Sequence, residues 1–168
     1  FVEGLCQEIK TVGVLLRETG RSVRTVYIGG GTPTTLSAEE LDRVLSALEE
    51  HISLDRCTEF TVEAGRPDTI TPEKLAVLSR HGVGRVSVNP QSMDNGVLER
   101  MGRPHTGADI RRAYAQVREA GGFAVNMDLI AGLPGDTPEG FAKSLREVMA
   151  LEPENITVHT LSIKRGSK

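Results

Sequence analysis

Four stretches of the sequence combine glycine or proline with polar side chains in a way that could bind a small ligand. They are residues 29–34 (GGGTPT), 89–93 (NPQSM), 101–106 (MGRPHT) and 128–135 (DLIAGLPG). Glycines let a ligand approach the main chain, whose amides and carbonyls can bind the charged ends of an amino acid. A carboxylate can hold an ammonium group, and a guanidinium can pair with a carboxylate through two hydrogen bonds.

Each stretch also has a purely structural explanation. Residues 29–34 are equally compatible with a tight strand-to-helix turn. Turn chemistry with a solvated Arg103 accounts for residues 89–106, and Asp128 alone is as compatible with a structural role as with a functional one. The glycine loop is not a phosphate loop, because no Gly-Lys-Ser/Thr follows, and the dinucleotide fingerprint fails at Thr34.

Strands and helices alternate around these stretches. Apolar residues at three- and four-residue steps predict a helix from Val2 to about Gly20, with Val12 on its apolar stripe. N-cap residues predict helices that start at Ser37, Thr71 and Thr137, and an apolar face predicts one that ends at Gly121. β-Branched and apolar runs predict strands at Thr25–Ile28, Phe60–Ala64, Val83–Val88, Phe123–Ile130 and Ile156–Ile163.

The alternation predicts an α/β fold with parallel strands, either a barrel or an open doubly wound sheet. The alternation of side chains between the two faces of each strand, here called side-chain parity, favours the barrel. Phe123, Val125 and their alternate neighbours form one apolar face, so Glu63 and Asp128 would point into a polar interior, where Asn89 and Gln91 continue the same parity. Because an eight-unit barrel needs about 250 residues, we expect an incomplete TIM-like barrel.

Composition narrows the classes of partner. The net charge is −3, with 20 basic and 23 acidic residues interspersed, which disfavours nucleic acid and membrane surfaces. Cys6 and Cys57 lie far apart, so we expect packed thiols in a reducing cytoplasm rather than a disulfide framework. The four histidines lack metal-ligand spacing.

The four stretches and residues 61–63 (TVE) occur in one order over nearly the whole chain, and together they resemble the radical S-adenosylmethionine (SAM) core of oxygen-independent coproporphyrinogen III oxidases. The NPQSM version is most similar to the branch called coproporphyrinogen dehydrogenase HemZ. The resemblance implies a set of eight cofactor-binding residues and no catalytic or metal-binding residue in this chain. It implies that the glycine loop contacts SAM, that Glu63 holds the SAM at the cluster, and that Ser162 is a further SAM contact. Gln91, Arg103 and Asp128 are implied to contact a second SAM or the substrate. The set is Gly30, Gly31, Thr32, Glu63, Gln91, Arg103, Asp128 and Ser162.

The resemblance also implies the chemistry of a parent protein. There a 5′-deoxyadenosyl radical, made by reductive cleavage of SAM at a [4Fe-4S] cluster, would drive oxidative decarboxylation of coproporphyrinogen III to protoporphyrinogen IX in haem biosynthesis. Partners would be the porphyrinogen and an electron donor. The family's C-x-x-x-C-x-x-C motif is absent, so residues 1–168 are expected to be an internal fragment, inactive alone, that lacks the first strand with the cluster cysteines and the C-terminal domain.

Two other hypotheses remain open. A related branch of the family handles haem without oxidising porphyrinogens, and the chain could serve that function. It could also belong to an ordinary barrel enzyme of another class, whose preceding sequence would carry no clustered cysteines.

Overall fold

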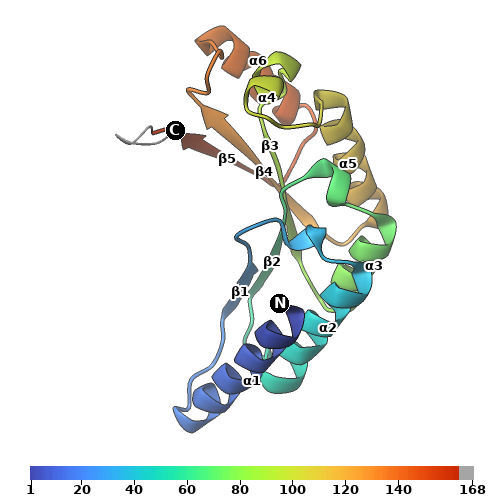
Figure 1. Cartoon of the computed structure of the whole chain (residues 1–168), viewed down its shortest axis with the longest axis vertical. Coiled ribbons are helices and arrows are strands. Elements are labelled where there is room, and N and C mark those ends of the chain that lie inside the picture. The colour runs from blue at the N-terminus through green and yellow to red at the C-terminus, as the bar shows by residue number, and fades with distance from the viewer. Residues whose placement is uncertain (163–168) are drawn as a thin grey trace.

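The chain folds into a curved five-stranded parallel sheet with helices along one face (Figure 1). The structure is a computed structural model that describes residues 1–162. The strands follow chain order, β1-β2-β3-β4-β5, and the sheet does not close. The predicted partial barrel is therefore confirmed: each crossover places its helix on the same side, as a barrel requires.

The strands are β1 (Thr25–Ile28), β2 (Glu59–Ala64), β3 (Arg85–Gln91), β4 (Ala124–Ala131) and β5 (Asn155–Thr160). Five α-helices were predicted: α1 (Val2–Glu18), α2 (Ala38–His51), α3 (Pro72–Arg80), α5 (Gly107–Ala120) and α6 (Pro138–Met149). Short 3₁₀ turns, η1 (Pro33–Thr35) and η2 (Pro67–Thr69), follow the first two strands.

Capping side chains start the helices where the sequence predicted. Ser37 and Glu40 form the expected capping box on α2, with the Glu40 amide donating to Ser37 Oγ at 3.1 Å. Thr71 and Thr137 cap α3 and α6, and both helices have proline at the first position. These bonds satisfy backbone donors that have no partner within a helix.

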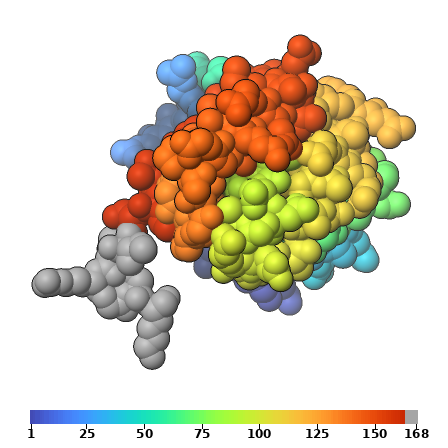
Figure 2. Space-filling view, turned by 90° about the horizontal axis from the view of Figure 1, so that it is seen from above, coloured from blue at the N-terminus to red at the C-terminus, as the bar shows by residue number. Residues whose placement is uncertain are grey.

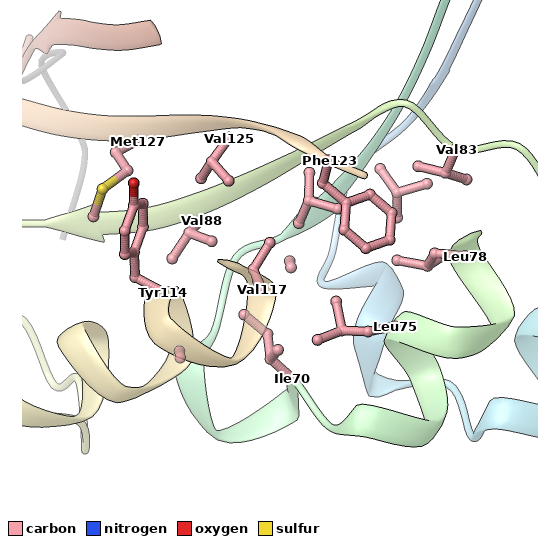
Figure 3. Packing of buried hydrophobic residues seen from close by; sticks show 14 of the residues in the cluster. Ile70, Leu75, Leu78, Val83, Val88, Tyr114, Val117, Phe123, Val125 and Met127 are labelled. Carbon is pink, nitrogen blue, oxygen red and sulfur yellow. The ribbon is translucent and has the colours of Figure 1, made fainter. Parts of the chain in front are cut away.

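The hydrophobic core lies between the sheet and the helices. Figure 3 shows Val125 and Met127 of β4 facing Tyr114 and Val117 of α5, with Leu78 of α3 farther along the same layer. These side chains are at most 6% exposed. Full burial of such an apolar side chain stabilises a fold by about 1.5–3 kcal/mol. This free energy would be lost if the other face of the sheet packed against the helices, so the apolar face must lie there.

The opposite face of the sheet is polar, as side-chain parity predicted. Glu63 pairs in register with Ser87, which pairs with Asn126, so these three side chains form one row across β2, β3 and β4. Asp128 lies two residues beyond Asn126 on the same face. Glu63 and Asp128 therefore share the face that would line a barrel interior.

Several sequence expectations need correction. Helix α4 (Asn95–Arg100), capped by Asp94, was not predicted because its single turn is too short for an apolar period. Val12 is 47% exposed rather than part of the α1 stripe; Gly13 is buried there instead, and its lack of a side chain allows close contact with the His51 carbonyl. Strand β3 starts at Arg85 and extends to Gln91, and β5 ends at Thr160, while Ile163 lies outside the described residues.

The loops after β3 and β4 meet α6 at one end of the molecule. Seen from above, the α4 and α6 regions lie side by side (Figure 2). The Met93 amide donates to Ser144 Oγ at 3.2 Å, and Arg100 Nη1 donates to the Gly135 carbonyl at 3.0 Å. Among residues 1–162 no helix is both long and apolar enough to cross a membrane.

An ion pair at the start of β4 gives a testable pH dependence. Glu154 accepts from Arg118 Nη1 at 2.8 Å and from the Val125 amide at 2.7 Å, and these bonds lower its pKa to about 2. Because the folded pKa lies below the unfolded value of about 4.3, the stabilisation is present above that value and is lost as pH falls toward 2. Glu154→Gln should lower the free energy of unfolding at pH 7 by about 1 kcal/mol.

Urea unfolding followed by circular dichroism at several pH values measures this effect. The difference between the wild-type chain and Glu154→Gln should shrink between about pH 4.5 and pH 2. Glu119→Gln, at an exposed position of α5, is the control and should leave stability unchanged. A difference that does not depend on pH would contradict the assignment.

Candidate functional site

A polar cleft of about 480 Å³ lies where β1, β2 and β3 end. Because the strands are parallel, their carboxyl ends meet at one edge, the edge on which barrel enzymes build their sites. Six of the eight predicted contact residues line this cleft: Gly30, Gly31, Thr32, Glu63, Gln91 and Arg103. The others in its lining are Gly65, Arg66, Asn89, Met101, Gly102, Pro104 and His105.

Glu63 is held in place by the strand next to it. Tyr27 on β1 donates its hydroxyl to Glu63 Oε1 at 2.6 Å. Partial burial, this hydrogen bond and the Glu63 charge together raise the pKa of Tyr27 to about 12. The phenol therefore stays protonated near neutral pH and leaves the second carboxylate oxygen of Glu63 available to a ligand.

The glycine loop allows the main chain to pass close to this pair. A Cβ at Gly29 would lie 2.6 Å from Tyr27 Cε1 and 3.0 Å from the carboxyl carbon of Glu63. Gly30 adopts a φ of +107°, a conformation that favours glycine. The loop thus has a steric reason for its glycines, and its exposed backbone forms one wall of the cleft.

Arg103 also lines the cleft, from the loop between α4 and α5. Its Nη1 donates to the Gly65 carbonyl at 3.4 Å. Burial, and next the positive charge of Arg66, hold the pKa of Arg103 below its usual value. A guanidinium remains charged after any such shift, so Arg103 contributes a half-buried cation to the cleft.

Gln91 reaches the cleft by a β-bulge and not by the simple alternation that the sequence suggested. Val88 pairs with Met127 but Gln91 pairs with Leu129, so β3 has one extra residue here, and Gln91 has a φ of +65°. Asn89 keeps the predicted parity, since its Oδ1 accepts from Ser87 Oγ at 3.0 Å. A non-glycine residue with positive φ is uncommon and marks a position that the surroundings hold in place.

Two buried polar side chains of the cleft lack hydrogen-bond partners among residues 1–162. They are Gln91, through Oε1, and His105, through both ring nitrogens. Burial, and next the charge of Arg103, lower the pKa of His105 below its usual value, which favours the neutral imidazole. Buried polar atoms without partners are costly, and they commonly indicate a place where a ligand or water binds.

Asp128 connects to the cleft indirectly. It is not among the lining residues; Asn126 Nδ2 donates both to Asp128 Oδ1 and to Ser87 Oγ, and Ser87 donates to Asn89 in the cleft wall. Ser162 lies beyond the end of β5, exposed and away from the cleft lining. The structure therefore brings together six of the predicted residues and leaves these two outside.

The described residues do not fit an iron–sulfur cluster, which needs several thiolates in one place. Cys6 Sγ lies 3.8 Å from the Arg43 carbonyl on α2, while Cys57 Sγ donates to the Glu59 carbonyl at 3.2 Å. Both thiols are half-buried, and Cys57 packs against the core. Between residues 1 and 162 no group of three or more potential metal ligands occurs.

Some cleft residues were not among the predicted contacts. Arg66 comes two residues after β2 ends, and this position at the carboxyl edge was the available signal. Tyr27, outside the lining itself, pairs in register with Thr61 on β2, and its hydroxyl reaches Glu63 two residues farther along that strand. From the sequence alone, a tyrosine on a short strand is equally compatible with a packing role.

Comparison with known proteins shows the family. The sequence profile described as "Radical SAM superfamily" matches residues 6–148. The chain belongs to the radical SAM superfamily. HemZ of Bacillus subtilis, described as an oxygen-independent coproporphyrinogen-III oxidase-like protein, is 46% identical over 169 residues, covering 100% of this chain and 34% of HemZ.

Two further relatives agree with the resemblance to coproporphyrinogen oxidases. The solved structure of HemN, the coproporphyrinogen III oxidase of Escherichia coli described as a radical SAM enzyme, superposes with a TM-score of 0.85 at 31% identity, covering 96% of this chain and 37% of that one. The haem chaperone HemW of Lactococcus lactis is 32% identical over 164 residues, 98% of this chain and 41% of HemW. This radical SAM chain thus spans between a third and two fifths of the length of these relatives, and the predicted family is confirmed.

The cleft of this radical SAM chain fits the amino acid end of SAM. Glu63 has a carboxylate oxygen for an ammonium group, Gln91 has a buried acceptor that no other described residue satisfies, and Arg103 has a cation for a carboxylate. The missing side chain at Gly29 keeps the approach open beside Glu63. These features meet both charges of a zwitterion within one cleft.

The Tyr27–Glu63 bond can be tested by titration. With ¹³C-labelled tyrosine, the Tyr27 signal should stay that of a protonated phenol up to pH 11, because its pKa is about 12. Glu63→Gln removes the negative charge and should shift the Tyr27 titration to lower pH. The Tyr27 signal is identified by its loss from the spectrum of the Tyr27→Phe variant. If Tyr27 titrates at the same pH in the Glu63→Gln variant as in the wild-type chain, the two side chains do not interact.

Gly29→Ala tests the steric role of the loop. The new methyl group should displace Tyr27 and Glu63 and weaken SAM binding by the full-length protein at least about tenfold, which corresponds to 1.4 kcal/mol. Gly4→Ala on α1, where a Cβ meets nothing within 4 Å, is the control. Isothermal titration calorimetry measures both; equal affinity of the two variants would rule out the proposed close approach.

Proposed function

We propose that the parent protein is an oxygen-independent coproporphyrinogen III oxidase or dehydrogenase, and that this chain supplies most of its SAM cleft. The observation that supports the proposal most strongly is the grouping of Glu63, Gln91 and Arg103 with the glycine loop around one cleft at the carboxyl edge of the sheet. When reductively cleaved, SAM supplies a radical able to take hydrogen from a substrate carbon. The conversion proposed is oxidative decarboxylation of coproporphyrinogen III, which turns propionate groups into vinyl groups.

The side chains of this chain would bind and orient. Glu63, held by Tyr27, would accept the ammonium group of SAM on its free oxygen, while the amides and carbonyls of Gly30, Gly31 and Thr32 would contact the same molecule. Arg103 would pair with a carboxylate, and Gln91 would accept a hydrogen bond. A bound ligand that satisfies these groups is fixed in one orientation, which is the protein's main contribution to cofactor chemistry.

Asp128 would act from the polar face of the sheet, next to the row formed by Glu63, Ser87 and Asn126. Its link through Asn126 and Ser87 to Asn89 connects it with the cleft wall, and no hydrogen bond from the described residues uses its second carboxylate oxygen. We keep Asp128 as a contact for a second SAM or the substrate. For Ser162 the support is weaker, because it is exposed beyond β5.

We also propose that residues 1–168 are part of a longer radical SAM core whose cluster ligands lie outside this chain. Support comes from the lack of grouped thiolates among the described residues and from the fraction of HemZ that the chain covers, 34%. The chain alone should therefore not cleave SAM. We further propose a reducing, cytoplasmic setting, which the free thiols of Cys6 and Cys57 support. The proposed partners are a porphyrinogen and an electron donor.

The full-length protein, reconstituted anaerobically, tests this proposal. Coproporphyrinogen III should be converted to protoporphyrinogen IX with formation of 5′-deoxyadenosine, both followed by mass spectrometry. Glu63→Gln should weaken SAM binding by about 10- to 100-fold, because a charge-assisted hydrogen bond contributes about 1.5–3 kcal/mol. Glu59→Gln, on the same strand and bonded to Thr61 and Arg85, is the matched control.

A second candidate function is haem handling, which the 32% identity to the haem chaperone HemW favours. Tight haem binding by the full-length protein without conversion of coproporphyrinogen III would support this function and contradict the oxidase proposal. A parent protein that neither binds SAM nor carries clustered cysteines would contradict both.

A further inference from the structure

Arg66 is a second cation in the lining of the cleft, and it has no role in the proposed binding of SAM. It follows Glu63 by three residues and serves as the N-cap residue of η2. Its backbone is fixed, because its carbonyl accepts from the Thr69 amide at 3.0 Å and from Thr69 Oγ1 at 2.7 Å. Arg66, an exposed residue, thus contributes to the cleft lining from a defined main-chain position.

No carboxylate neutralises the two cations. Within residues 1–162, neither Arg66 nor Arg103 lies within 4.0 Å of an Asp or Glu oxygen, although seven other arginines or histidines form such pairs. Glu63, the acidic residue of the lining, is bonded to Tyr27 instead. Two like charges in a partly buried cleft repel one another, and a bound anion would remove this repulsion.

Two other groups of the cleft offer hydrogen-bond acceptors. Glu63 has a free carboxylate oxygen, and the buried Oε1 of Gln91, a residue only 9% exposed, has no partner among the described residues. A ligand that satisfies both these acceptors and the two arginines must therefore carry a donor group, such as an ammonium, as well as a carboxylate. An inorganic anion would satisfy only the arginines.

We propose that Arg66 and Arg103 together bind one carboxylate of the ligand in this cleft, and that Arg66 is a specificity-determining residue for that carboxylate. The inference rests on the proposed function for the identity of the ligand. The carboxylate belongs either to the methionine part of SAM or to a propionate of the porphyrinogen. A guanidinium suits both, because its planar donors match a carboxylate in pairs.

Equilibrium dialysis of the full-length protein separates the two sources. Arg66→Ala should raise the Kd for SAM about tenfold, while the Kd for S-adenosylmethioninamine, which lacks the carboxylate, should change less than about twofold. Arg66→Lys should recover part of the loss, since it retains charge but not paired donors. Arg56→Ala, an exposed arginine before β2 at the other edge of the sheet, is the matched control.

If instead only coproporphyrinogen III binds about tenfold more weakly to Arg66→Ala, the carboxylate is a propionate and the proposal stands with that source. Equal losses for SAM and S-adenosylmethioninamine, or no loss for any of the three ligands, would overturn it.

Chemical labelling tests the carboxylate site independently of cofactor loading or turnover. Modification of Arg66 by phenylglyoxal, measured by peptide mass spectrometry, should slow in the presence of L-methionine but not L-methioninol, or of coproporphyrin but not its tetramethyl ester. Protection by a free carboxylate in a protein that fails to convert coproporphyrinogen would contradict the proposed function and leave this inference intact. Equal labelling within both pairs would overturn it.

Discussion

The hydrogen bond from Tyr27 to Glu63 fixes the carboxylate around which the rest of the cleft is arranged. It joins neighbouring strands at the point where the glycine loop begins, and a side chain at Gly29 would displace one or both of the bonded residues. It also uses one oxygen of the carboxylate and leaves the other free. The protein can therefore present an oriented negative charge without waiting for the ligand to order it, which reduces the entropy lost on binding.

Packing on the other face of the sheet makes this arrangement possible. Val62, Val86 and Val125 are at most 1% exposed between the sheet and the helices, and a shift of one residue in register would bury Glu63 instead. The apolar layer thus determines which side chains face the interior, and parallel pairing brings their carboxyl ends to one edge. The site is a consequence of the same constraint that stabilises the fold.

Much of this could be predicted from the sequence, for reasons that differ between residues. Capping residues such as Ser37 act locally, and strand alternation is a local property, so the helices and the inward face of Glu63 were predictable. Gln91 was predicted at the site, but the β-bulge that brings it there was not, because a bulge depends on how β3 pairs with β4. The role of Arg66 depends on its proximity to Arg103, which lies far away in the sequence, and no local pattern contains that information.

A crystal structure of the full-length protein with SAM bound tests the central claim most directly. The account predicts the SAM ammonium within hydrogen-bonding distance, about 2.7–3.2 Å, of the Glu63 carboxylate, with Tyr27 still donating to the other oxygen and the glycine loop against the ligand. SAM bound away from the carboxyl edge of β1, β2 and β3, or an ammonium group held by a residue other than Glu63, would contradict it.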